Sequence, residues 1–294
     1  MPSEQHEAFV ELIKAGTPLA ADDIEGQRAN MVAMTENLPL AEGTVCEDAM
    51  AGDVPVTWVT AAGADPDRVV MYLHGGGYVI GSRVTHRSLA SRISATAAAR
   101  VLLVEYRLAP EAPFPAAVDD AQTAWNWMLE QGVAAERAAI AGDSAGGGLT
   151  LAVLQRIRAS DAPLPACAVC LSPWADLEGT GESARPGVVD DPMIVPENLA
   201  DFGRTYAQDA TGDPLASPIH ADYAGFPPLL IQVGTREVLL SDSRTVAEKA
   251  RAAGVEVVLE EEPDLIHVFQ AFAGVPEADA AVERIGTYVQ ARTG

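Results

Sequence analysis

The sequence predicts a doubly wound α/β fold, because short β-rich runs alternate with helical stretches along the chain from about residue 54. Several of these runs are apolar on both faces, as strands of a parallel sheet covered by helices must be. The length of 294 residues suits one large domain with a small appendage. The expected strands are 69–73, 101–106, 138–141, 166–171, 229–233 and 255–259. The expected helices between them are 88–98, 116–131, 147–159 and 241–253.

Two segments depart from this alternation. The first forty-odd residues are typical of amphipathic helices: one ends at Gly16-Thr-Pro18, and a second runs from about residue 22 to 37. Residues 179–224 are rich in Gly, Pro and Asp, with a helical piece near 197–207. This segment is too long for a plain connection in a compact domain, so we expect it to form a lid together with the N-terminal helices.

The composition excludes several classes of partner. The formal net charge is −23, and Lys14 and Lys249 are the only lysines, which disfavours binding to nucleic acid and to anionic membranes. The longest apolar runs fall short of the roughly 18 residues that a membrane span needs. Residues 1–11 are polar and acidic, unlike a signal peptide. We therefore expect a cytoplasmic protein.

The three cysteines do not indicate a metal or disulfide site. Cys167 and Cys170 form a Cys-x-x-Cys pair inside an expected strand. Residues three apart on a strand point to opposite faces, so the two thiols cannot easily share a metal ion or a disulfide. We interpret them as buried structural thiols, and Cys46 adds no partner for a disulfide framework.

The segment Gly142-Asp-Ser-Ala-Gly146 carries the expected nucleophile. A Gly-x-Ser-x-Gly pattern is weak evidence alone, but here it lies between an apolar strand and a helix. The flanking glycines give room for a strained turn that projects the Ser144 hydroxyl near the helix N-terminus, where developing negative charge is favoured. The alternative is a glycine-rich turn that only saves space.

A second segment, His74-Gly-Gly-Gly77, follows an expected strand directly. Acyl transfer needs N–H donors aimed at an oxyanion, and side chains would block so close an approach. We assign Gly75, Gly76 and Ala145 as donors, with Gly77 as the next candidate, and expect His74 to shape the loop. A phosphate-binding loop is disfavoured, since no Walker lysine follows and the pattern is not Gly-x-Gly-x-x-Gly.

The general base follows from chain order. Where a serine stands on such a strand–turn–helix, the acid and then the histidine come later in the chain. Three of the five histidines precede Ser144, and His220 lies in the Pro-rich segment. His267, in a loop after the last expected strand, is the candidate base, although a lone histidine in an apolar segment is often a core residue.

Three acids compete for the role of orienting this histidine. Glu237 lies in the loop after the strand 229–233, where a carboxylate can reach across to His267. Asp242 falls where the next helix begins and fits a capping or dipole role. Asp264 is close to His267 in sequence and ranks third. Glu237 is the favoured acid.

Taken together, these motifs resemble those of the bacterial hormone-sensitive-lipase-like (family IV) esterases of the α/β-hydrolase superfamily. The resemblance covers most of the chain from about residue 45. Its motifs are His74-Gly-Gly-Gly77, Tyr106-Arg-Leu-Ala-Pro-Glu111, Phe114-Pro-Ala-Ala-Val-Asp-Asp120, Gly142-Asp-Ser-Ala-Gly146 and Ile266-His-Val-Phe269. The chain departs from the family at the acid, where Glu237-Val-Leu-Leu-Ser replaces the usual Asp-Pro-Leu-x-Asp.

The resemblance implies an eight-stranded, mostly parallel sheet with a helical cap, and hydrolysis of short- to medium-chain acyl esters without a cofactor or metal. Residues 1–44 and 179–224 would form the cap, and 45–178 with 225–294 the catalytic domain. Homodimers are common in the family, so the resemblance allows one here. Hydrolysis of a lactone, an amide or a xenobiotic acetyl group would use the same triad. A non-catalytic receptor on this scaffold is disfavoured, because Ser144 and His267 are both present.

Overall fold

The computed structural model describes residues 1–15, 23–160 and 162–294. Eight strands form one sheet in the order β1-β2-β4-β3-β5-β6-β7-β8. Strand β2 pairs antiparallel with both β1 and β4, and all neighbouring pairs from β4 to β8 are parallel. This confirms the predicted α/β fold with a mostly parallel sheet. The strands are β1 Val45–Ala51, β2 Val54–Thr60, β3 Asp65–Leu73, β4 Ala99–Val104, β5 Ala138–Asp143, β6 Cys167–Leu171, β7 Leu229–Gly234 and β8 Val257–Glu262.

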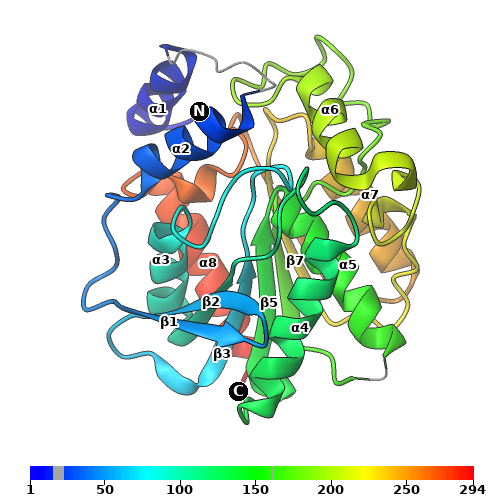
Figure 1. Ribbon diagram of the computed structural model, residues 1–294. Coiled ribbons are helices and arrows are strands. Elements are labelled where there is room, and N and C mark those ends of the chain that lie inside the picture. Colours follow the sequence, from blue (N-terminus) through cyan, green and yellow to red (C-terminus); the bar gives the residue numbers. More distant parts are fainter. Residues whose placement is uncertain (16–22, 161) are drawn as a thin grey trace.

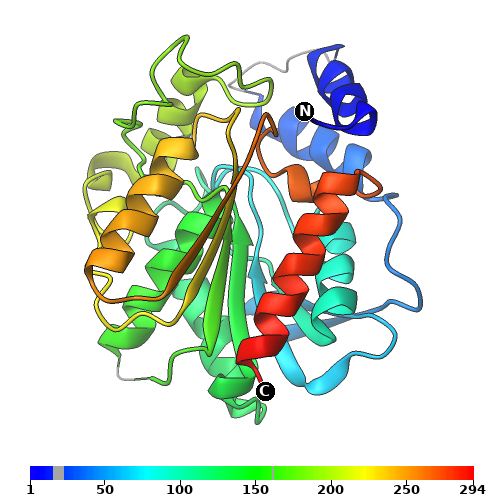
Figure 2. The same cartoon turned by 180° about the vertical axis from the view of Figure 1, so that it is seen from behind.

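Helices cover both faces of the sheet (Figures 1 and 2). One hydrophobic core lies between the sheet and α4, α5 and α7, and a second lies between the opposite face and α3 with α8. The α-helices are α1 Glu4–Ala15, α2 Ile24–Thr35, α3 Arg87–Ala97, α4 Ala116–Glu130, α5 Ala145–Ala159, α6 Pro196–Ala207, α7 Leu240–Ala252 and α8 Pro276–Arg292. The predicted end of the first helix at residues 16–18, and the predicted start of the second at residue 22, lie outside the described residues.

Several predicted strand boundaries were wrong. The run expected at 69–73 already begins at Asp65, and the run expected at 138–141 ends at Asp143. The run expected at 101–106 forms a strand at Ala99–Val104, because residues 105–108 turn away to form a loop. The run expected at 255–259 begins later, at Val257, and continues to Glu262, where Arg244 and Arg284 pair with the acidic residues at its end. Acidic side chains are tolerated there because β8 is an edge strand with one neighbour.

The cysteines of β6 are free and buried, as predicted. Cys167 belongs to the core beside α3 and α8, and Cys170 belongs to the core on the opposite face. Two thiols on opposite faces of one strand cannot meet, so the Cys-x-x-Cys pair serves packing.

Helices α1, α2 and α6 lie at one end of the molecule, over the carboxyl ends of the parallel strands (Figure 1). Helix α1 packs through Phe9, whose ring stacks on Phe272 at 4.9 Å. Helix α2 has no fully buried side chain, but its Arg28 binds the carbonyls of Val79 and Ala109 and both carboxylate oxygens of Glu111. These contacts hold the N-terminal helices against the loops that follow β3 and β4.

Candidate active site

Ser144 stands at the junction of β5 and α5, in a backbone conformation that few side chains adopt. Its φ of 53° and ψ of −121° place it in a strained region. The turn is this tight because two glycines allow backbone contact: a Cβ on Gly142 would lie 2.2 Å from the carbonyl oxygen of Gly146, and one on Gly146 would lie 2.0 Å from that of Leu73. The serine is nearly buried, with 8% of its surface exposed.

Glu237 and His267 form a buried hydrogen-bonded pair at the same end of the sheet, where the parallel strands have their carboxyl ends. His267 Nδ1 lies 2.9 Å from Glu237 Oε2, and since a carboxylate only accepts, Nδ1 is the donor. Glu237 is fully buried and His267 is 5% exposed. Burial lowers the pKa of His267, but the hydrogen bond and charge of Glu237 outweigh it, so the net pKa is raised.

A serine that the sequence analysis missed joins this pair to the nucleophile's loop. The hydroxyl of Ser172 donates to Glu237 Oε1 at 2.9 Å, and the N–H of Gly234 donates to the same oxygen at 2.5 Å. The neighbours of Ser172 hold the nucleophile: Ser144 N–H donates to Leu171 O at 2.8 Å, and Trp174 N–H donates to Ser144 O at 2.9 Å. The segment after β6 therefore binds both the acid and the serine backbone.

The two other candidate acids lie elsewhere. Asp242 is buried and its Oδ2 accepts the N–H groups of Ala175 and Asp176, at 2.9 and 2.8 Å, so it braces the loop after β6. Burial raises its pKa to about 8, against the effect of those two donors. Asp264 is exposed, with a φ of 60°. Of the three acids, Glu237 is the one whose carboxylate contacts His267.

The glycine loop after β3 contains two of the predicted donors. The N–H of Gly75 donates to Asp143 Oδ1 at 3.1 Å and is therefore already engaged within the protein. Within the part of the chain that the structure describes, the N–H groups of Gly76, Gly77 and Ala145 have no protein acceptor. Gly76 and Gly77 have φ values of 114° and 61°, which glycine adopts without strain. Gly75, predicted as a donor, is therefore already bound to Asp143, whereas Gly77, the next candidate, has no such partner among the described residues.

Aromatic side chains hold this loop in place. His74 is fully buried, stacks on Tyr106 at 4.2 Å, and receives the Tyr106 hydroxyl on its carbonyl oxygen at 2.5 Å. Burial lowers the pKa of His74 to about 3, so it is neutral and shapes the loop. From the other side, Tyr206 of α6 stacks on Tyr78 at 3.7 Å. The helix of residues 179–224 therefore packs directly on the glycine loop.

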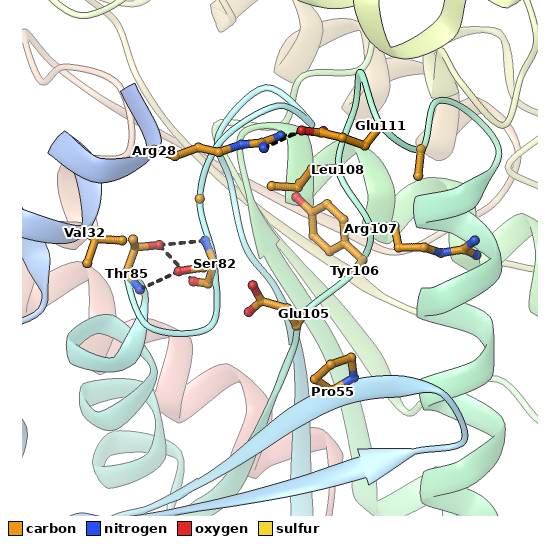
Figure 3. A pocket seen from close by; sticks show the side chains of 12 residues that line it. Arg28, Val32, Pro55, Ser82, Thr85, Glu105, Tyr106, Arg107, Leu108 and Glu111 are labelled. Atoms are coloured by element: carbon orange, nitrogen blue, oxygen red, sulfur yellow. Dashed lines mark hydrogen bonds and ion pairs between the residues drawn. The ribbon is translucent and has the colours of Figure 1, made fainter. Parts of the chain in front are cut away.

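A cavity of about 660 Å³ lies beside this region (Figure 3). Its walls come from α2, from the loop after β3 and from residues 105–112, and the Arg28–Glu111 ion pair spans it. Neither Ser144 nor His267 lines it. The cavity is therefore separate from the candidate catalytic groups.

Proteins of similar sequence and structure are hydrolases. Residues 70–271 match the family model of the alpha/beta hydrolase fold. An acetyl-hydrolase of Streptomyces hygroscopicus is 40% identical, with 100% of this chain and 99% of the relative aligned. A crystallised esterase of the bacterial hormone-sensitive lipase family is 42% identical, with a TM-score of 0.95 over 100% of both chains. The esterase EstE5, soaked with p-nitrophenyl butyrate, is 39% identical, with a TM-score of 0.94 over 99% of both chains.

The doubly wound, mostly parallel sheet and the family match over residues 70–271 make the protein an α/β-hydrolase. Within that class, the chain belongs to the bacterial hormone-sensitive lipase family of esterases, and it is a carboxylic ester hydrolase. No helix among the described residues is long and apolar enough to cross a membrane.

Proposed function

We propose that Ser144, His267 and Glu237 form the catalytic triad of an esterase for short- to medium-chain acyl esters. The observation that carries the proposal is the buried hydrogen bond between His267 Nδ1 and Glu237 Oε2, at the sheet edge where Ser144 stands in strained geometry. With Nδ1 bound to the acid, Nε2 is left as the nitrogen that accepts a proton.

The reaction takes place in two halves. His267 Nε2 takes the Ser144 proton while Oγ bonds to the ester carbonyl carbon and the C=O pair moves onto oxygen. The tetrahedral intermediate collapses, the C–O bond to the alcohol breaks, and His267 gives its proton to the leaving oxygen. Water then attacks the acyl-enzyme by the same route, releasing the carboxylic acid and restoring the serine. Glu237 stabilises the imidazolium in each half.

The oxyanion of each tetrahedral intermediate binds to the N–H groups of Gly76, Gly77 and Ala145. Support comes from their lack of protein acceptors among the described residues and from the position of Ala145 as the first residue of α5. Loss of one such donor costs a factor of about 10²–10³ in kcat in comparable hydrolases.

Residues 1–44 and 179–224 form the cap in this proposal. Support comes from α6, whose Tyr206 stacks on the glycine loop, and from α2, whose Arg28 binds the loops after β3 and β4. The preference for short acyl groups rests on the relatives, one named an acetyl-hydrolase and one soaked with a butyrate ester.

Hydrolysis of p-nitrophenyl esters from acetate to palmitate, by the wild type and by Ser144→Ala, tests the proposal. We expect turnover of the acetate and butyrate esters that the substitution abolishes. Activity on long chains alone would contradict the acyl preference. Turnover that survives Ser144→Ala would contradict the nucleophile.

A further inference from the structure

Asp143, the residue directly before the nucleophile, is the meeting point of three donors. Its carboxylate accepts the Tyr72 hydroxyl at 2.7 Å and the Gly75 N–H at 3.1 Å, and it lies 3.3 Å from His86 Nε2. The Gly75 nitrogen also lies 3.4 Å from His86 Nε2, so the histidine borders both groups. Asp143 is 3% exposed and His86 is 7% exposed. The three donors come from β3, from the glycine loop and from the residue before α3.

The contact with His86 favours the ionised form of this buried carboxylate. Burial would raise the pKa of Asp143, but His86 outweighs it and the net pKa is lowered. Burial would likewise lower the pKa of His86, but Asp143 raises it above 6.5. The neighbouring ring of His74 lies 5.5 Å away and stays neutral. Of these two histidines, His86 is the one whose net pKa is raised.

The carboxylate in turn fixes the glycine loop relative to the nucleophile. A Cβ on Gly75 would lie 2.2 Å from Asp143 Oδ2, so the loop backbone rests directly on this side chain. The hydrogen bond from Gly75 sets the first peptide plane of the loop, and the next two N–H groups in the chain belong to Gly76 and Gly77. Asp143 directly precedes Ser144 in the chain. Its side chain therefore fixes the position of the nucleophile relative to the N–H groups of Gly76 and Gly77.

We propose that His86 is a positioning residue for the oxyanion hole: it orients Asp143, which holds the Gly75 N–H and thereby directs the N–H groups of Gly76 and Gly77. The inference rests on the proposed function. Neither residue is marked by chain order or motif, because His86 precedes Ser144 and Asp143 occupies a variable position of the Gly-x-Ser-x-Gly pattern. The available signal was an acid at the end of a wholly apolar strand.

Two neutral substitutions of similar volume separate positioning from packing. His86→Gln keeps an N–H that can donate to Asp143, whereas His86→Met has none. We expect His86→Met to lower kcat for p-nitrophenyl butyrate by about ten- to a hundredfold, with KM little changed, since the lost interaction acts in the transition state. His86→Gln should recover most of this loss. His220→Ala, at an exposed histidine, is the matched control and should retain wild-type kcat.

The decisive readout is inhibition by an alkyl trifluoromethyl ketone. Ser144 Oγ adds to its carbonyl carbon, the serine proton moves to His267, and the resulting hemiketal oxyanion occupies the donor site. We expect the inhibition constant to rise in His86→Met by the same factor as kcat falls, and to return toward wild type in His86→Gln. Should His86→Met fail to fold, His86→Asn, whose amide is too short to reach Asp143, takes its place.

Equal kcat in the Gln and donor-free variants would overturn the positioning role. So would a lower kcat with an unchanged inhibition constant. Failure of the proposed function is seen separately, because the wild type itself would then hydrolyse no ester and bind no trifluoromethyl ketone.

Discussion

Glu237→Gln is expected to remove nearly all activity with the fold intact, because the surrounding donors decide which way the new amide points. The Oε1 position receives the Gly234 N–H and the Ser172 hydroxyl. An amide oxygen satisfies both donors, whereas an NH₂ group there would face them. The NH₂ of the glutamine is therefore directed at His267 Nδ1.

This orientation forces the wrong tautomer on the imidazole. Nδ1 must then accept, so the proton resides on Nε2 and that nitrogen can no longer take the proton of Ser144. The equivalent change in a serine protease lowers kcat by about 10⁴, which corresponds to about 5 kcal/mol of barrier at 1.36 kcal/mol per tenfold. We expect a loss of about 10³–10⁴ here.

The assay is steady-state hydrolysis of p-nitrophenyl butyrate, with a thermal melt to establish that each variant folds. Asp242→Asn is the matched control, a second carboxylate-to-amide change five residues away. Its amide oxygen can accept the N–H groups that Asp242 Oδ2 now accepts, so kcat should stay close to wild type. The reasoning is refuted if Glu237→Gln keeps more than about a tenth of kcat, or if Asp242→Asn is equally damaging.

Three further results are expected. Because the pKa of His267 is raised and its neutral form is the base, kcat/KM should rise with pH through a midpoint above 6.5; a midpoint below that value contradicts the pairing with Glu237. Ser172→Ala should lower kcat by about tenfold, the worth of one hydrogen bond to a charged group, and wild-type kcat would remove Ser172 from the network. The pKa of Asp242, about 8 in the folded protein against 3.8 ordinarily, means that the folded state holds this proton more tightly, so stability falls as pH rises between these values. The unfolding free energy of Asp242→Asn should therefore improve relative to wild type as pH rises in urea titrations, and a constant difference would contradict the shift.

The fold was predictable because it depends on patterns that are local in the sequence. Alternating apolar strands and amphipathic helices suffice for a doubly wound sheet, and the motif Gly142-Asp-Ser-Ala-Gly146 locates a strand–helix turn. The boundaries of β4 and β8 were less accessible. They depend on where the chain leaves the sheet and on arginines from other elements that pair with acidic strand ends.

Residue type and chain order were enough to predict candidate site residues, but not the contacts between residues that lie far apart in the chain. The direction of the Gly75 N–H depends on a carboxylate 68 residues later in the chain, and no local pattern encodes that contact. The contact between Ser172 and Glu237 likewise joins loops 65 residues apart. Chain order alone could not reveal His86, because its contribution acts through Asp143 and not on the proton of the nucleophile.

The residues of the proposed triad follow strands that differ in how many neighbouring strands they pair with. Ser144 follows β5, which is flanked by β3 and β6, whereas His267 follows β8, which pairs only with β7. Fraying of an outer strand withdraws the imidazole while the central serine stays in place. On slow heating the enzyme should therefore lose its hydrolytic activity at a lower temperature than that at which the sheet unfolds. The activity should return on cooling. A measured inactivation temperature would then reflect local opening at the edge strand β8, not unfolding of the central strands around β5.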